Sequence, residues 1–322
     1  DDYPHVEAEE LSESAEETIK AICEILGMRT SQKPSKDKPF SACFSPLGVQ
    51  LDMRGAPEDV VLVAPKPERV QAILAQVSGY LEAGAMMGVE ADALAQRIRF
   101  LRETHFGRCG SKVLRALAGH SGASGASTEL GAELRRGLEW LLGFLPEAEP
   151  RMVRPPAMHH EVVIFTDGAN EPSKVSVGGV LFTRTGPPQY FGDLVPARIV
   201  IAWRSVGGFQ VIGQAELLPI YLASVLWAEE LRDQYSIWLI DQNAARQAMV
   251  KGYSPAGRSA TIIDSTTELL ARARTWLWFA RVASASNIAD GPSRLEFWEI
   301  LSLFPRSVRR HVDWDNVLEG KV

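Results

Sequence analysis

The sequence predicts an α/β protein in which a mixed five-stranded sheet with flanking helices follows a mainly helical N-terminal region. Two observations support this fold class. Apolar residues recur at helical spacing before residue 150, whereas short apolar runs bounded by turn residues or acids follow from residue 161. Hydrophobic residues make up 46% and charged residues 23% of the 322 residues, a balance typical of a packed globular protein of roughly two domains.

The N-terminal half is expected to consist mainly of helices. Apolar side chains at i, i+3, i+4, i+7 spacing mark one of them, namely Val70, Ile73, Leu74 and Val77. In chain order, the expected segments are a helix over 7–26 that ends at Gly27, a short strand over 44–51, helices within 67–118, a small-residue linker over 119–128 and a helix over 129–144 that closes on Pro146.

The C-terminal half is expected to combine strands and helices. Five short apolar runs predict strands at 162–165, 179–182, 199–203, 236–240 and 276–282. Helices are expected over 214–232, 243–250 and 261–274, with a last helix that begins near Asn287. Three strands in series imply an antiparallel meander, and the strand–helix–strand units after it imply parallel pairing.

The composition argues against several classes of protein. No apolar run approaches the ~18 residues of a membrane helix, and the acidic N-terminus is unlike a signal peptide. Cys23, Cys43 and Cys109 lack ligand-like spacing, so reduced thiols of an intracellular protein, nuclear or cytoplasmic, are expected. The net charge of −6 differs from the basic surface of many nucleic-acid binders, so local clusters must decide that question.

Four carboxylates occupy comparable places in this outline. Asp167 ends the first strand, Glu216 lies in the first turn of the 214–232 helix, Asp241 ends the fourth strand and Asp290 opens the last helix. The position of any one of these acids alone is explained by a turn, by a helix cap or by a favourable charge near the start of a helix. Together they favour a cation site, because buried carboxylates need compensation and hard oxygen ligands select Mg²⁺ or Mn²⁺.

The segments around these acids resemble the type 1 ribonuclease H domain attached to retroelement reverse transcriptases. The segments that carry the resemblance are FTDGA at 165–169, AELL at 215–218, IDQNAA at 240–245 and NIADGPSR at 287–294. The last is the most specific, since its Ala-Asp-x-x-Ser-Arg resembles the ending typical of such elements.

The resemblance implies a ribonuclease H-like domain over 156–298 that cuts the RNA strand of RNA–DNA hybrids with two Mg²⁺ ions, Mn²⁺ being possible. It implies that Asp167 bridges the ions, with Glu216 and Asp241 on one and Asp290 on the other. One ion would activate a water and the other would stabilise the leaving 3′-oxygen. Many relatives carry a His before the last Asp; residues 281–289 contain none, so slower turnover is expected, and the nearest downstream histidine is His311.

The residues before this domain resemble the end of a reverse transcriptase palm over 1–54 and a helical thumb or connection over 55–155, with a C-terminal tail over 299–322. Asp1 and Asp2 would be the acidic pair, residues 33–38 the lysine-bearing loop and residues 47–49 the primer-grip hairpin. The resemblance implies that the fingers and the first palm acid belong to a missing remainder of the enzyme, so polymerisation by this chain alone is not expected. Which lysine of the loop matters stays open.

Basic residues within 97–115 are candidates for binding the phosphates of a template–primer or a hybrid. They are Arg97, Arg99, Arg102, Arg108, Lys112 and Arg115, and a solvated helix face is the alternative. Asn243 and Ser293 are candidate contacts to the nucleic-acid backbone, with helix capping as the alternative. For Trp276, Trp278 and Phe279, base stacking is conceivable, but their spacing in a strand favours core packing.

Two other functions remain open at this stage. The chain could be a catalytically decayed, nucleic-acid-binding remnant of a retroelement polyprotein, or another nuclease of the same fold such as an exonuclease or transposase. The intact set of four acids favours an active hybrid ribonuclease over the decayed copy. Asp290 within the NIADGPSR segment argues against a transposase, which usually ends its acidic set with Glu.

Overall fold

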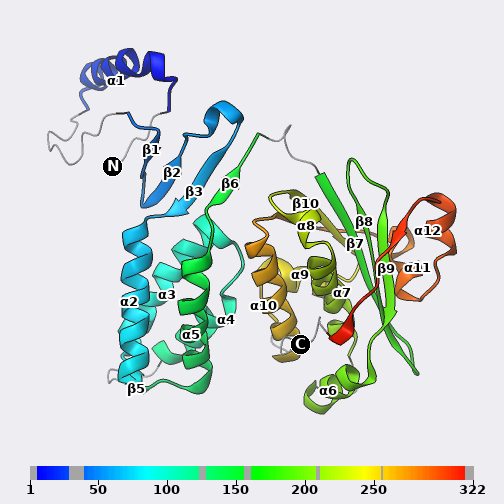
Figure 1. The fold of residues 1–322 in the computed structure, drawn as a ribbon. Coiled ribbons are helices and arrows are strands. Elements are labelled where there is room, and N and C mark those ends of the chain that lie inside the picture. The colour runs from blue at the N-terminus through cyan, green and yellow to red at the C-terminus, as the bar shows by residue number, and fades with distance from the viewer. Residues whose placement is uncertain are drawn as a thin grey trace.

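The chain forms an N-terminal helical unit and a C-terminal α/β domain, which lie side by side (Figure 1). Each contains one of the two larger sheets. The computed structural model describes residues 6–28, 40–122, 128–155, 161–207, 211–254 and 257–315. The predicted palm residues Asp1 and Asp2 and the lysine-bearing loop over 33–38 lie outside these residues. Within them, no helix combines the length and the apolar character needed to cross a membrane.

The N-terminal unit combines a small antiparallel sheet with helices that pack against one another. The sheet order is β1-β2-β3-β6, with β1 at Cys43–Phe44, β2 at Val49–Asp52, β3 at Val61–Pro65 and β6 at Arg151–Val153. The helices are α2 (Pro67–Ala83), α3 (Gly88–Leu101), α4 (Ser111–Ser121) and α5 (Ala132–Glu147). Short elements between them are η2 (Ala56–Glu58), β4 (Ala85–Met86), the π-helical turn η3 (Arg102–Phe106) and β5 (Thr128–Glu129).

The helical prediction for this unit is confirmed, with differences at the segment ends. The predicted strand over 44–51 is a hairpin, because Leu47 and Gly48 adopt positive φ values of 49° and 86° and reverse the chain. The predicted linker is shorter than 119–128, since α4 continues to Ser121 and β5 begins at Thr128. Strands β1 and β2 precede residue 54, whereas β3 and β6 follow it. One sheet therefore spans the two expected regions, 1–54 and 55–155.

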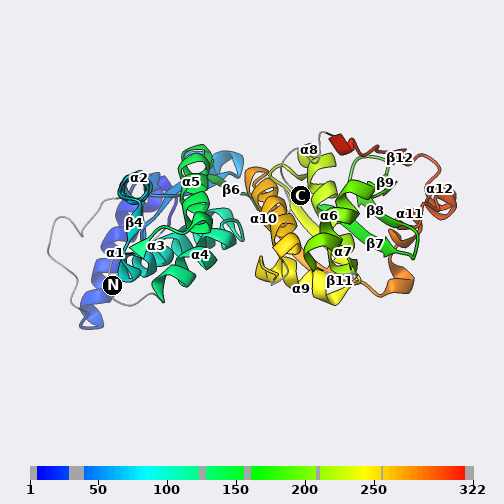
Figure 2. The ribbon, with the colours of Figure 1, turned by 90° about the horizontal axis from the view of Figure 1, so that it is seen from below.

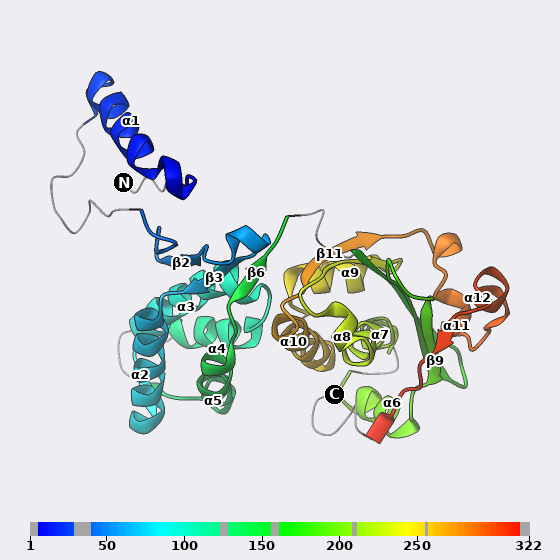
Figure 3. The same ribbon diagram turned by 45° about the horizontal axis from the view of Figure 1, so that its top comes forward.

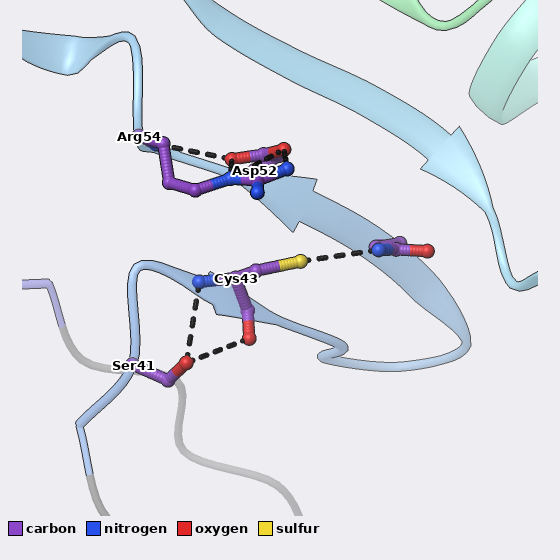
Figure 4. A network of polar contacts seen from close by, with 5 residues as sticks. Ser41, Cys43, Asp52 and Arg54 are labelled. Atoms are coloured by element: carbon purple, nitrogen blue, oxygen red, sulfur yellow. Dashed lines mark hydrogen bonds and ion pairs between the residues drawn. The ribbon is translucent and has the colours of Figure 1, made fainter.

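Polar contacts stabilise the hairpin (Figure 4). Ser41 Oγ donates to the Cys43 carbonyl at 2.9 Å, and Gln50 Nε2 donates to Cys43 Sγ at 3.1 Å. The hydrogen-bonded Arg54 guanidinium lowers the pKa of Asp52 to about 2. These contacts connect β1, β2 and the turn after β2.

Helix α1 (Ser12–Ile25), preceded by η1 (Glu9–Leu11), buries none of its residues and lies apart from the rest of the unit (Figure 3). The predicted helix over 7–26 is thus confirmed. Gly27 follows it with a φ of 68°, the left-handed conformation with which many helices end.

The C-terminal domain has the mixed sheet that the sequence predicts. Its order is β11-β10-β7-β8-β9-β12, with β7 at Glu161–Asn170, β8 at Val175–Phe182, β9 at Gln189–Leu194, β10 at Tyr235–Ile240, β11 at Trp276–Arg281 and β12 at Val308–Arg309. The first three strands form an antiparallel meander, and β10 and β11 run parallel to β7. The mixed pairing is as expected, but the sheet has six strands and not five, because the two-residue β12 pairs with β9.

Helices cover both faces of this sheet (Figure 3). Helix α7 packs against β7 and β8, and α11 packs against the same strands from the opposite face. The remaining bounds are α6 (Ala197–Gly207), α7 (Ile212–Leu226), α8 (Ala228–Leu231), α9 (Asn243–Lys251), α10 (Gly257–Arg272), η5 (Ser284–Ser286), α11 (Asp290–Ser293) and α12 (Trp298–Leu303).

The predicted third strand was wrong. Residues 199–203 lie in α6, where Ile199, Val200 and Trp203 are buried and Ile201 is 65% exposed. Buried positions at i, i+1 and i+4 are helical spacing, which a five-residue apolar run does not distinguish from a strand. The third strand is β9, directly after the Gly–Pro–Pro turn over 186–188.

Two of the predicted acid positions also need correction. Asp167 does not end the first strand, because β7 continues to Asn170 and pairs Asp167 with Gly178 of β8. Glu216 lies in the second turn of its helix, since α7 begins at Ile212. The predicted 214–232 helix is interrupted at Trp227, which separates α7 from α8.

Helix α10 joins the two units and faces α4 and α5 (Figure 2). The contacts across this boundary include Arg115–Asp264 at 3.4 Å, Trp140 Nε1 to Glu268 Oε2 at 2.9 Å, Arg272–Glu147 at 2.8 Å and Trp276 Nε1 to the Met152 carbonyl at 3.2 Å. Helix α10 therefore packs within the α/β domain and also supplies three of these contacts with the helical unit.

The close approach of α7 to β7 at Gly168 predicts a large effect of adding one methyl group. A Cβ atom at Gly168 would lie 2.2 Å from the Ala215 carbonyl oxygen, a backbone atom that cannot rotate away. We expect Gly168→Ala to lower the free energy of unfolding by about 3 kcal/mol or more. Gly143→Ala is the control, because a Cβ there meets no atom within 4 Å in α5 and should stabilise the helix by roughly 0.5–1 kcal/mol. Urea unfolding of both variants tests this expectation, and equal stabilities would contradict it.

Candidate metal centre

Three of the four predicted acids meet at one point of the sheet. Asp167 on β7, Glu216 on α7 and Asp241 after β10 each offer a carboxylate oxygen, and these oxygens all lie within 4.8 Å of one another. Parallel pairing places the end of β10 beside β7, which brings Asp241 to Asp167. Gly168 allows the backbone of α7 to approach β7, which brings Glu216 to both.

Burial and nearby negative charge make two of these acids, Asp167 and Glu216, unusually basic. Burial raises the pKa of Asp167 to about 6, although a hydrogen bond from Ser293 opposes the rise. Burial, followed by the nearby charges of Asp167 and Asp241, raises the pKa of Glu216 to about 8. Three carboxylates in this position are costly as anions unless positive charge accompanies them.

Two oxygens of the group have no protein partner in the described part of the chain. Glu216 Oε2 and Asp241 Oδ1 are buried and accept no hydrogen bond there. Buried oxygens without donors and with neighbouring carboxylates are the ligand set that hard divalent cations such as Mg²⁺ and Mn²⁺ prefer. The residues present therefore fit a divalent cation.

Asp290 stands outside this group of three. Its side chain is half-exposed, and both carboxylate oxygens accept hydrogen bonds from Arg294 at 3.0–3.1 Å. It is nevertheless near enough for its charge to raise the pKa of Asp167. The structure thus brings together Asp167, Glu216 and Asp241, and the metal role of Asp290 stays a prediction.

Ser293 has a different role from the one its sequence suggested. It is fully buried, so the predicted contact of its side chain with nucleic acid is wrong. Its hydroxyl donates a hydrogen bond to Asp167 Oδ2. Sequence reasoning identified the segment but missed this contact, because only the tertiary packing of α11 shows which strand residue Ser293 reaches.

Asn243 follows Asp241 by two residues and begins α9. Its Oδ1 accepts a hydrogen bond from Arg246 Nη2 at 3.0 Å. The helix is capped by the preceding Gln242, whose Oε1 accepts from the Ala245 amide. Capping therefore does not explain Asn243, and its contact with nucleic acid stays a prediction.

The basic residues of the helical unit fall into two groups. Arg97, Arg99 and Arg108 are exposed, although Arg97 also bonds Gln76. Arg102, Lys112 and Arg115 are partly buried. Of these, Arg102 donates to the Gly107 carbonyl at 3.1 Å, and Arg115 pairs with Asp264. The exposed residues keep their side chains available to phosphates, whereas Arg102 and Arg115 already have structural partners.

The aromatic residues of β11 also differ in how far they are buried. Phe279 packs against Trp238, and the half-buried Trp276 lies under Arg151, whose guanidinium is 3.5 Å from the ring centroid. Trp278 is 70% exposed, so the prediction of core packing was wrong for this residue. The reason is that β11 is the edge strand, and alternate side chains on it face away from the helices.

No protein-family model matches the chain, and no curated protein matches it either. Among solved structures, RNase H1 from the halophilic archaeon Halobacterium salinarum NRC-1 is 20% identical with a TM-score of 0.34, and the match covers 42% of this chain and 95% of that chain. LC11-RNase H1 in complex with an RNA/DNA hybrid is 16% identical with a TM-score of 0.27, and the match covers 44% and 99%.

A third similar structure is the foamy viral protease-reverse transcriptase in complex with dsDNA, which is 14% identical with a TM-score of 0.37. The match covers 85% of this chain but 52% of the viral chain. This chain therefore spans about half the length of that protein.

The raised pKa of Glu216 predicts how stability depends on pH without metal. The protein binds the proton of Glu216 up to about pH 8, whereas unfolded glutamate releases it near pH 4.5. The stability contributed by the neutral acid is therefore complete below pH 4.5 and is lost as pH rises toward 8. In EDTA, Glu216→Gln should match the parent at pH 4.5 and exceed its free energy of unfolding at pH 8.5, by on the order of 3 kcal/mol.

Chemical denaturation at both pH values measures this difference. Glu139→Gln is the control, because Glu139 is exposed on α5 and should leave the pH dependence unchanged. A Glu216→Gln curve parallel to that of the parent over the whole range would contradict the burial of a titrating carboxyl at this site.

Proposed function

We propose that the C-terminal domain is a metal-dependent ribonuclease that cuts the RNA strand of RNA–DNA hybrids, within a retroelement-derived reverse transcriptase. The observation that carries this proposal is the buried group of Asp167, Glu216 and Asp241, whose oxygens lie within 4.8 Å of one another. The sequence segments around these acids and the mixed sheet that holds them support the same proposal.

Asp167, Glu216 and Asp241 would hold the cation. Asp290 would join them if its ion pair with Arg294 broke. Bound divalent ions supply a water of lowered pKa and stabilise charge on a leaving oxygen. The protein contributes a fixed geometry, since each acid stands on a different packed element. Glu216 holds a proton at neutral pH without metal. Its carboxylate can therefore bind the cation only when this proton leaves.

The exposed arginines of the helical unit supply the expected contact with a hybrid or template–primer. Arg97, Arg99 and Arg108 extend from α3 and from the turn before α4. Contacts of guanidinium groups with phosphates are independent of base sequence. This suits a substrate recognised by its backbone.

A second candidate function is a decayed remnant that binds nucleic acid without cutting. One observation favours it: Arg294 already pairs with Asp290. Both functions share the binding surface and differ only in cleavage, so one assay separates them.

The nuclease proposal predicts that Asp241→Asn abolishes cutting of a labelled RNA–DNA hybrid in Mg²⁺ and leaves hybrid binding nearly unchanged. Asparagine keeps the size of the side chain but removes the anionic ligand. The parent should cut the RNA strand in Mg²⁺ and be inactive in EDTA, and the exposed Asp92→Asn should cut like the parent. Equal cleavage by Asp241→Asn and the parent would overturn the assigned site, whereas binding without cleavage by the parent would select the decayed remnant.

Phosphate contacts by the exposed arginines predict a reduced salt dependence of hybrid binding in their variants. Each lost contact lowers the slope of log affinity against log salt concentration by about 0.9. We expect this change for Arg99→Gln and again for Arg108→Gln, measured by fluorescence anisotropy with an uncut hybrid in EDTA. Arg184→Gln, exposed between β8 and β9 in the other domain, is the control. Unchanged slopes in both test variants would show that these arginines form only a solvated helix face.

A further inference from the structure

Helix α11 rests directly on two glycines of the sheet. Gly178 on β8 pairs with Asp167 on one side and with Gly192 of β9 on the other, so the three residues form a row across the sheet. A Cβ atom at Gly178 would lie 2.3 Å from the Ser293 amide nitrogen, and one at Gly192 would lie 2.3 Å from the Pro292 carbonyl oxygen. Only the absence of these side chains lets α11 approach so closely.

Two hydrogen bonds then attach this segment to neighbouring residues of β7. Asn287 Nδ2 donates to the Thr166 carbonyl at 3.2 Å, and Ser293 Oγ donates to Asp167 Oδ2. The Ser293 hydroxyl also lies 2.9 Å from the Asp290 carbonyl, but Asp167 is the closer acceptor. Both side chains are at least 95% buried, so water does not compete for these bonds.

The bond from Ser293 engages only one oxygen of Asp167. Among the described residues, Oδ1 of this carboxylate accepts no hydrogen bond, while Oδ2 is held by the serine. A short carboxylate that is free to turn about its side-chain bonds would occupy several orientations. A buried donor on one oxygen restricts it to one of them.

We propose that Ser293 is a positioning residue that holds the Asp167 carboxylate in its metal-binding orientation, with α11 seated on Gly178 and Gly192 as its support. This inference rests on the proposed function in one respect, since it takes the group of three acids as a cation site. Ser293 does not touch the cation in this proposal. It acts through Asp167, as hydrogen-bond partners of metal ligands do in many proteins.

Cation binding by the full chain tests the proposal without measuring cleavage. Mn²⁺ is titrated into the protein by calorimetry, and melting temperatures are recorded in parallel. Ser293→Ala removes the donor and should weaken Mn²⁺ binding about tenfold or more. Ser293→Thr keeps the hydroxyl but adds a methyl group to a packed site, so it should lower the melting temperature while retaining the affinity of the parent.

Ser224→Ala is the matched control. Ser224 is also buried, on α7, but its hydroxyl donates to the Ile220 carbonyl at 2.8 Å, so its removal should leave Mn²⁺ affinity unchanged. Asp167→Asn should abolish the binding and so identify the site. A parent-like affinity in Ser293→Ala, or equal losses of affinity in Ser293→Ala and Ser293→Thr that follow their melting temperatures, would overturn the positioning role.

Failure of the proposed function has a different signature. If the parent binds Mn²⁺ through Asp167 and Ser293→Ala binds it more weakly, the positioning role stands even when neither protein cuts a hybrid. If the parent binds no Mn²⁺ at this site, there is no metal-binding orientation to hold, and the positioning proposal is overturned together with the metal-dependent function.

Discussion

The arrangement of the α/β domain depends on keeping three carboxylates together in a part of the sheet from which water is largely removed. Asp167, Glu216 and Asp241 repel one another as anions, and burial strengthens that repulsion. They stay together because each is fixed by its own strand or helix, and the packing of those elements does not depend on the acids. The domain thus carries an electrostatic cost at one point that the surrounding apolar core offsets.

Contacts between backbones set the geometry of this point. On one face of the sheet, Gly168 meets the Ala215 carbonyl of α7, and on the other, Gly178 and Gly192 meet the backbone of α11. With the layers this close, a short aspartate on the strand, a longer glutamate on the helix and a serine on α11 meet without long loops. The glycines are therefore as much a part of the site as the side chains that carry its chemistry.

The sequence was sufficient for the parts of the fold that depend on local pattern. The first two strands of the meander, the parallel strands and the proximity of Asp167 to Asp241 follow from short apolar runs. Residues 199–203 were assigned to a strand because β-branched apolar runs of that length fit either periodicity until their buried face is known. The contact of Ser293 with Asp167 depends on a neighbour distant in the chain, and the exposure of Trp278 depends on a place at the edge of the sheet, neither of which a local pattern encodes. The pairing of Asp290 with Arg294, in contrast, is a local i, i+4 contact.

The ion pairs at α10 make the contact between the helical unit and the α/β domain sensitive to ionic strength. Pairs such as Arg272–Glu147 and Arg115–Asp264 hold the helical unit against the α/β domain, and they are partly open to solvent. Dissolved ions weaken pairs of this kind. Concentrated electrolyte therefore weakens the contact between the two units at the same time as it competes with the protein for any bound polyanion.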